Sequence, residues 1–180
     1  MCSSDLVENL KDINLAEYAI LHFAAHAVVQ TELVPFSQPS IVLTAKNTSA
    51  SKGLLQFSDI LELKQNADLV ILSACDTGLG QLKGGEGIIG LTRAFLYSGA
   101  SSAVVSLWKV EDQSTALLMQ KFHERLKSGQ NKDEALRQAK LDIMKTQIQL
   151  KATGSQESLA APFFWAPFIL IGDGGPIHLN

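Results

Sequence analysis

Apolar residues in this chain fall into two patterns, which are short unbroken runs and runs interrupted at helical spacing. Three unbroken runs, at residues 18–25, 67–74 and 102–108, lack the polar alternation of a half-exposed strand. Such runs are typical of strands in a parallel sheet that is covered on both faces. A fourth run, residues 163–172, contains Pro167, which predicts an edge strand or an irregular start. The pattern therefore predicts an α/β fold with a mostly parallel sheet flanked by helices.

The interrupted runs predict helices between these strands. They cover residues 4–15, 59–64, 88–98, 112–127 and 133–147. We expect Ser58 to cap the second helix, Gly99 to end the third, and Asn131 with Glu134 to form a capping box for the last. Residues 41–44 and 54–57 flank a polar stretch and predict a hairpin, whereas the polar residues 151–158 are expected to be mobile.

Composition and charge exclude several classes of protein. Hydrophobic residues make up 46% of the 180 residues and charged residues 18%, which fits one globular domain spanning residues 1–180. A net charge of -3 gives no electrostatic case for direct nucleic-acid binding. No apolar run approaches the roughly 20 residues of a membrane helix, and residues 1–5 lack the basic and apolar regions expected of a signal peptide. Two cysteines make no disulfide framework, so we expect a reducing, cytoplasmic location.

Candidate chemistry lies where two of the apolar runs end. The second run leads to Cys75, and the first leads to His26. If the two strands are parallel neighbours, both residues lie at the edge where parallel sheets carry their active sites. A histidine beside a thiol is the arrangement of a base and its nucleophile. The alternative is that Cys75 is a small buried hydrophobic residue and His26 a hydrogen-bonded structural histidine.

Two ligand-binding alternatives accompany this pair. His22, His26 and Cys75 are zinc-ligand types, but the sequence places no fourth ligand. The glycine-rich residues 78–87 follow a strand and precede a helix, as in a dinucleotide-binding turn, but their glycine spacing does not fit. We therefore expect no metal and no cofactor. His22 is interpreted as structural, His123 as a helix-surface residue and His178 as part of a loose tail.

Several motifs in one order resemble a known family. They are LHFAAH at residues 21–26, LSACDTGLG at 72–80, GEGI at 85–88, AFLYSGA at 94–100, SLWKVED at 106–112 and FFWAPFILIGD at 163–173. Together they are similar to the CHAT family, caspase-like domains usually found with TPR arrays. The resemblance implies a caspase-like three-layer sandwich and a catalytic dyad of His26 and Cys75. Caspases have the histidine about 50 residues before the cysteine, and the separation here is 49.

The resemblance also implies roles for the surrounding residues. The backbone N–H groups of Cys75 and Ala27 would hold the oxyanion, although the family usually has glycine where this chain has Ala27. Ser73, Trp108 and Asp112 are the expected substrate-binding residues, and Asp112 would favour cleavage after arginine or lysine. The alternative for Asp112 is an N-cap of the helix that starts there. The family's domain normally begins further upstream, so we expect the first N-terminal elements to be absent.

The expected function is that of a cysteine endopeptidase of the caspase-like clan, acting on a protein or peptide. A TPR region or a regulatory protein is the further partner that the resemblance implies. The alternative function is a catalytically silent CHAT scaffold that binds a partner protein through the same cleft.

Overall fold

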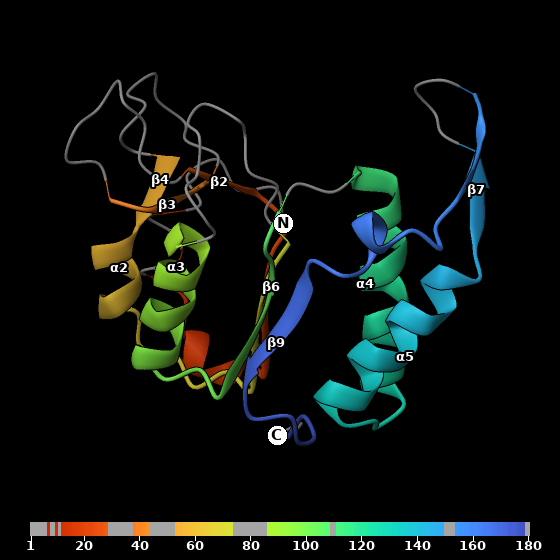
Figure 1. Cartoon of the computed structure of the whole chain (residues 1–180). Helices are drawn as coiled ribbons and strands as arrows, with labels where there is room; N and C mark the ends of the chain where they lie inside the picture. The colour runs from red at the N-terminus through yellow and green to blue at the C-terminus, as the bar shows by residue number, and fades with distance from the viewer. Residues whose placement is uncertain are drawn as a thin grey trace.

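A four-stranded sheet forms the centre of the protein, seen here in a computed structural model (Figure 1). The structure describes residues 7, 10, 12–28, 38–43, 53–73, 86–108, 111–149 and 154–178. The strands lie in the order β1 (Ile20–Phe23), β5 (Leu69–Leu72), β6 (Ser102–Ser106) and β9 (Phe168–Gly172). The first three strands are parallel, and β9 pairs antiparallel with β6 at the edge. The predicted mostly parallel sheet is confirmed, and β9 begins just after Pro167, as the proline requires.

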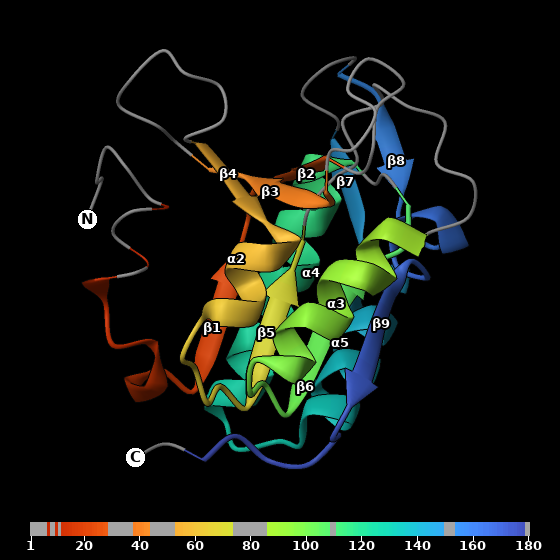
Figure 2. The ribbon, with the colours of Figure 1, turned by 90° about the vertical axis from the view of Figure 1, so that its left-hand side faces the viewer.

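Helices cover both faces of this sheet and complete three layers (Figure 2). α2 (Phe57–Glu62) and α3 (Glu86–Tyr97) pack on one face, and α4 (Asp112–Lys127) and α5 (Lys132–Met144) pack on the other. Side chains of β5 alternate between the two cores. Val70 and Leu72 face α2 and α3, whereas Leu69 and Ile71 face α4 and α5. Every residue of β5 is therefore buried, which explains why its sequence lacks polar alternation.

Two small sheets lie outside the central one. β2 (His26–Val28), β3 (Ser40–Val42) and β4 (Leu54–Gln56) form an antiparallel sheet, which confirms the predicted hairpin. Figure 2 shows this sheet next to the end of the central sheet where β1 ends. β7 (Gln147–Gln149) and β8 (Gln156–Ser158) form a separate hairpin, so the prediction of a mobile segment at residues 151–158 is wrong for β8. Short 3₁₀ turns are η1 (Leu15–Glu17) and η3 (Pro162–Phe164).

The helix starts differ from the predicted caps. α2 begins one residue before Ser58, and its capping box is formed by Gln56 and Asp59. Asn131 precedes α5 as predicted, but its side chain makes no capping hydrogen bond. The Glu134 N–H donates to Asp133 Oδ1 at 2.6 Å instead, and the Glu134 carboxylate is paired with Arg137. Both errors have one cause: several polar residues near a helix start compete for the same free N–H groups, and the tertiary contacts choose among them.

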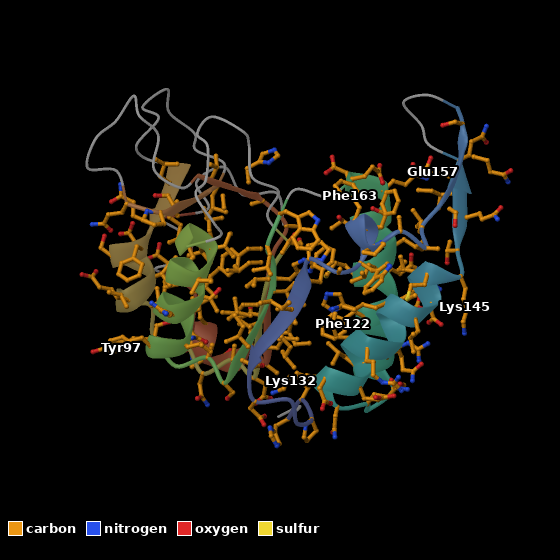
Figure 3. The ribbon with its side chains drawn as sticks, viewed as in Figure 1. Tyr97, Phe122, Lys132, Lys145, Glu157 and Phe163 are labelled. Atoms are coloured by element: carbon orange, nitrogen blue, oxygen red, sulfur yellow. The ribbon has the colours of Figure 1, made fainter. Side chains whose placement is uncertain are left out.

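A fully buried lysine joins the layers at the end of the sheet opposite the small sheet. Lys132 donates from Nζ to the Asp68 carbonyl and to the Asp173 carboxylate, each at 3.1 Å. Figure 3 shows Lys132 at the start of α5, below β9, and Phe122 in the layer between α4 and the sheet. A buried ammonium is tolerated only with such partners. No helix in the described part of the chain has the length and apolar character needed to cross a membrane.

Candidate functional site

A cavity of about 1050 Å³ opens beside the carboxyl ends of β1 and β5. Its wall comes from the end of β1 and the two residues after it, from β2, from β3, from the residue after β5, and from the first turns of α4. The described residues that line it are Leu10, His22, Phe23, Ala24, Ala25, His26, Val42, Leu43, Ser73, Asp112, Thr115, Ala116, Met119 and Gln120. Parallel sheets bind their ligands outside this edge because the strand ends leave a crevice there. A cavity therefore lies at the edge of the sheet where β1 and β5 end.

His26 lines this cavity as the first residue of β2. The sequence predicted a single strand over residues 18–25 that ends in His26. The chain instead leaves β1 after Phe23 and enters the small sheet at His26, where it pairs with Val42. The side chain of His26 is exposed to the cavity rather than packed into the sheet. This exposure is what a base needs in order to reach a substrate or a thiol.

Ala27, the departure from the family's glycine, lies inside β2 opposite Ile41. A residue in a strand has extended backbone, which every amino acid adopts. Its methyl group is buried in the core that α2 and α3 share. The substitution of alanine for glycine is therefore accommodated at this position without left-handed backbone.

A second polar group at the cavity joins three elements. His22 Nε2 lies 3.0 Å from Ser73 Oγ, and His22 Nδ1 lies 3.1 Å from His123 Nε2. The two imidazoles are stacked, with centroids 5.2 Å apart. The sequence analysis treated His22 as structural and His123 as a helix-surface residue. His123 on α4 is instead hydrogen-bonded to His22 on β1. The two residues are 101 positions apart in the sequence, so no local pattern indicates the contact.

Both imidazoles in this group are held in the neutral form. Loss of hydration, with a smaller contribution from the nearby His123, lowers the pKa of His22 to about 4. Loss of hydration also lowers the pKa of His123. Each ring still reaches the surface along one edge, but protein atoms replace much of the water that would stabilise an imidazolium.

We expect this pair to make the fold less stable in mild acid. The folded-state pKa of His22 lies below its unfolded value of about 6.5, so the unfolded chain binds the proton more tightly. The resulting loss of unfolding free energy is absent above pH 7, grows as the pH falls from about 6.5, and reaches its full value below about pH 4. Because the ring is partly exposed, we expect about 1 kcal/mol at pH 5. Urea unfolding of wild type and His22→Gln at pH 7.5 and 5 isolates the effect, and an equal loss in both proteins would contradict it.

The two remaining expected substrate-binding residues lie in different surroundings. Asp112 lines the cavity, with its side chain exposed at the rim. The predicted alternative, that Asp112 caps α4, is wrong, because Glu111 is the N-cap and accepts from the N–H groups of Gln113 and Ser114 at 2.9 and 2.7 Å. Trp108 does not line this cavity. It is 42% exposed and donates to the Phe163 carbonyl at 3.4 Å.

The predicted nucleophile, Cys75, lies outside the described residues, as do residues 78–85 of the glycine-rich loop and Lys109. Ser73, two positions before Cys75, is the last described residue at this strand end. The structure therefore brings His22, His26, Ser73 and Asp112 together at one cavity. Among the described residues, no group of three His, Cys, Asp or Glu side chains is placed to hold a metal ion.

His178 is also not part of a loose tail, as the sequence analysis expected. Its backbone N–H and its imidazole Nδ1 both contact the Asp68 carboxylate, at 2.6 and 3.1 Å. Asp68 immediately precedes β5, so this contact lies at the end of the sheet opposite the cavity. His178 is therefore a matched distant control for the cavity histidines.

Comparison with known proteins gives one family and two relatives. The model of the CHAT domain matches residues 5–173 of this chain. Tetratricopeptide repeat protein 28 of Mus musculus is 31% identical over 119 residues, and Tetratricopeptide repeat protein 28 of Homo sapiens is 32% identical over 119 residues. In both cases the alignment covers 66% of this chain and 4% of the relative, so the chain corresponds to a small part of each relative.

Proposed function

The chain belongs to the CHAT domain family, of the caspase-like peptidase clan, and from that premise we propose that it is a cysteine endopeptidase with Cys75 as nucleophile and His26 as base. The observation that carries the proposal is the cavity at the carboxyl ends of β1 and β5, which His26 and Ser73 line. Cys75 follows Ser73 by two positions in the sequence. We treat residues 1–180 as one domain that acts in the cytoplasm without metal or cofactor.

The proposed reaction is acyl transfer through a thioester. A thiol with a pKa of about 8.5 is only a few per cent thiolate at neutral pH, so His26 is needed to take its proton. The Cys75 sulfur then attacks the peptide carbonyl, and the proton on His26 passes to the leaving amine as the C–N bond breaks. Water, deprotonated by His26, cleaves the thioester and releases the acid and the thiol. General acid–base catalysis of this kind contributes about 10²–10⁴-fold.

The tetrahedral intermediate needs fixed donors for its oxyanion, and we assign the backbone N–H groups of Ala27 and Cys75 to that role. Each such donor is worth about 10²–10³ in rate. The extended backbone at Ala27 supports this assignment, because an alanine there keeps the N–H group that glycine would offer.

Asp112 is the residue that we propose selects the side chain before the cut. Its side chain is exposed and lines the cavity, and a carboxylate in that place favours arginine or lysine. Since the side chain is exposed, the ion pair is expected to contribute about 0.5–1 kcal/mol, or about 2–5-fold in kcat/KM. Ser73, which lines the cavity, is proposed to contact the substrate there, and Trp108 to contact a part of the substrate that extends beyond the cavity.

Asp112→Asn is therefore expected to lower kcat/KM for peptides cut after arginine by about 2–5-fold and to leave peptides cut after leucine unchanged. A panel of fluorogenic peptides that differ only at the residue before the cut measures this, at 20 and 300 mM salt. The matched control is Glu124→Gln, a carboxylate later on the same helix. An arginine preference that survives Asp112→Asn would remove Asp112 from specificity.

A second candidate function is a CHAT scaffold that binds a partner protein in the same cavity without cleaving it. The similarity to Tetratricopeptide repeat protein 28 supports a partner of the TPR class or a regulatory protein. The apolar part of the cavity wall suits a peptide side chain, since it includes Phe23, Val42 and Met119.

Hydrolysis separates the two functions. Wild type and Cys75→Ala are incubated with a peptide that has arginine before the scissile bond, and binding and cleavage are measured on the same samples. The endopeptidase proposal expects binding by both proteins and cleavage by wild type alone. Equal binding with no cleavage by either protein would favour the scaffold.

A further inference from the structure

The layer between the sheet and α4 is apolar along its length but ends in a polar group at the cavity. On β1, His22 follows Ile20 on this face, and on β5, Ser73 follows Ile71. On α4, His123 follows the fully buried Phe122, which Figure 3 places between the helix and the sheet. Three polar side chains thus replace the next apolar layer. His22 is exposed at this edge, and Ser73 and His123 are half-buried, so the three groups lie where the apolar layer meets the cavity.

These three side chains satisfy one another in a single chain of hydrogen bonds. The chain runs from Ser73 Oγ to His22 Nε2 over 3.0 Å, and from His22 Nδ1 to His123 Nε2 over 3.1 Å. It joins β5, β1 and α4 at the sheet edge where the cavity opens, and it uses both nitrogens of His22.

The chain is complete with both imidazoles neutral. In one arrangement Ser73 donates its proton to His22, and His22 donates from Nδ1 to His123. In the other, every donor and acceptor is reversed, so His123 donates to His22 and His22 donates to Ser73. One added proton on His22 is compatible with the chain, because His22 then donates to both Ser73 and His123. When His123 is protonated as well, no acceptor remains between the rings. The lowered pKa values of His22 and His123 are consistent with neutral rings at pH 7.

We propose that His22 and His123 are positioning residues for the cysteine, because their hydrogen-bond chain to Ser73 fixes the end of β5 against β1 and α4 two residues before Cys75. This inference rests on the proposed function. Without the chain, the end of β5 is held by the β-ladder and by the packing of Leu72, but not by side-chain hydrogen bonds to β1 and α4. We expect the thiol then to be less well placed relative to His26. Acyl transfer is sensitive to such placement, and a displacement of about 1 Å can cost about 10²-fold in rate.

Two other titratable groups line the cavity with His22, namely His26 on β2 and Asp112 on the first turn of α4, and His123 is hydrogen-bonded to His22 directly. The experiment therefore varies His123, which does not line the cavity, so that the substrate-contacting residues stay unchanged. His123→Leu removes the hydrogen bond, and His123→Gln keeps a side-chain acceptor and donor of similar reach.

The measurement is the pH profile, from pH 5 to 9, of iodoacetamide alkylation at Cys75, together with kcat and KM for the arginine peptide. For His123→Leu we expect kcat to fall about 10-fold with KM unchanged, and the thiol midpoint to move toward 8.5. His123→Gln should restore both, and circular dichroism confirms that each variant is folded. A merely structural residue would lower the folded fraction without moving the midpoint.

Three outcomes decide the inference. If wild type is active and its profile depends on His26, an unchanged midpoint and kcat in His123→Leu overturn the positioning role alone. If wild-type alkylation does not depend on His26, the proposed function fails, and the positioning role falls with it. Nitrogen-15 NMR adds a separate check on the chain itself. It should find both rings neutral at pH 7, as their lowered pKa values indicate, and two cationic rings at that pH would overturn the chain.

Discussion

Replacing His26 by alanine is expected to lower kcat/KM for peptide hydrolysis by about 10²–10⁴-fold and to slow alkylation of Cys75 at pH 7 by about 10-fold. The hydrolysis effect is larger because the imidazole acts twice, as base toward the thiol and as acid toward the leaving amine. Alkylation needs only the thiolate, so it reports the loss of the first role. The ratio of the two effects therefore identifies which proton transfers depend on His26.

The matched control is His178→Ala, which removes an imidazole from the opposite end of the sheet. It should leave hydrolysis and alkylation within about twofold of wild type, because the contact that it loses lies far from the cavity. Equal alkylation rates in wild type and His26→Ala would refute the base-assisted dyad, whatever the effect on hydrolysis.

The largest expected effect on stability comes from Gly99, which ends α3. Its φ is +121°, a region that residues with a side chain rarely adopt, and an added Cβ would overlap the backbone carbonyl of Gln65. Gly99→Ala should therefore cost about 2–5 kcal/mol, the sum of left-handed backbone strain and steric overlap with a group that cannot move away. Chemical denaturation by urea, read by circular dichroism, gives the free energy of unfolding.

Substitutions at two other glycines distinguish backbone strain from steric overlap. Gly129, after α4, has φ +84° but nothing within 4 Å of an added Cβ, so Gly129→Ala should cost only about 1–2 kcal/mol. Gly90 lies within α3 with open space around it, so Gly90→Ala should stabilise the protein by about 0.8–1.0 kcal/mol. A cost at Gly99 no greater than at Gly129 would show that the contact with Gln65 is not tight.

The sheet was predictable from the sequence because strands that are buried on both faces consist of consecutive apolar residues. Every residue of β5 and β6 is buried, and their unbroken apolar runs follow from that environment. Pro167 located the edge strand for a similar reason, since an interior strand needs the N–H that proline lacks. The hairpin β7–β8 was missed, because its residues are polar and mostly exposed, so no apolar pattern marks it.

The site was only partly predictable, because its contacts join distant parts of the chain. His26 and Asp112 reach the cavity as the motif order indicated. The break between β1 and β2 was missed, because Ala24 and Ala25 continue the apolar run of β1 up to His26. His123 carried no signal, since its partner His22 lies 101 residues earlier. The alternative that Asp112 caps α4 is wrong because Glu111 is the cap, and local sequence does not choose between these adjacent carboxylates.

The most direct test of the endopeptidase account is the location of a covalent adduct. The chain is incubated at pH 7.5 with an acyloxymethyl ketone peptide that carries arginine next to the warhead, and the adduct is mapped by mass spectrometry of the digested protein. Wild type should be modified at Cys75 and not at Cys2, and His26→Ala should be modified at least about 10-fold more slowly. Modification of Cys2 and Cys75 at equal rates, or of neither, would contradict a catalytic dyad in this chain.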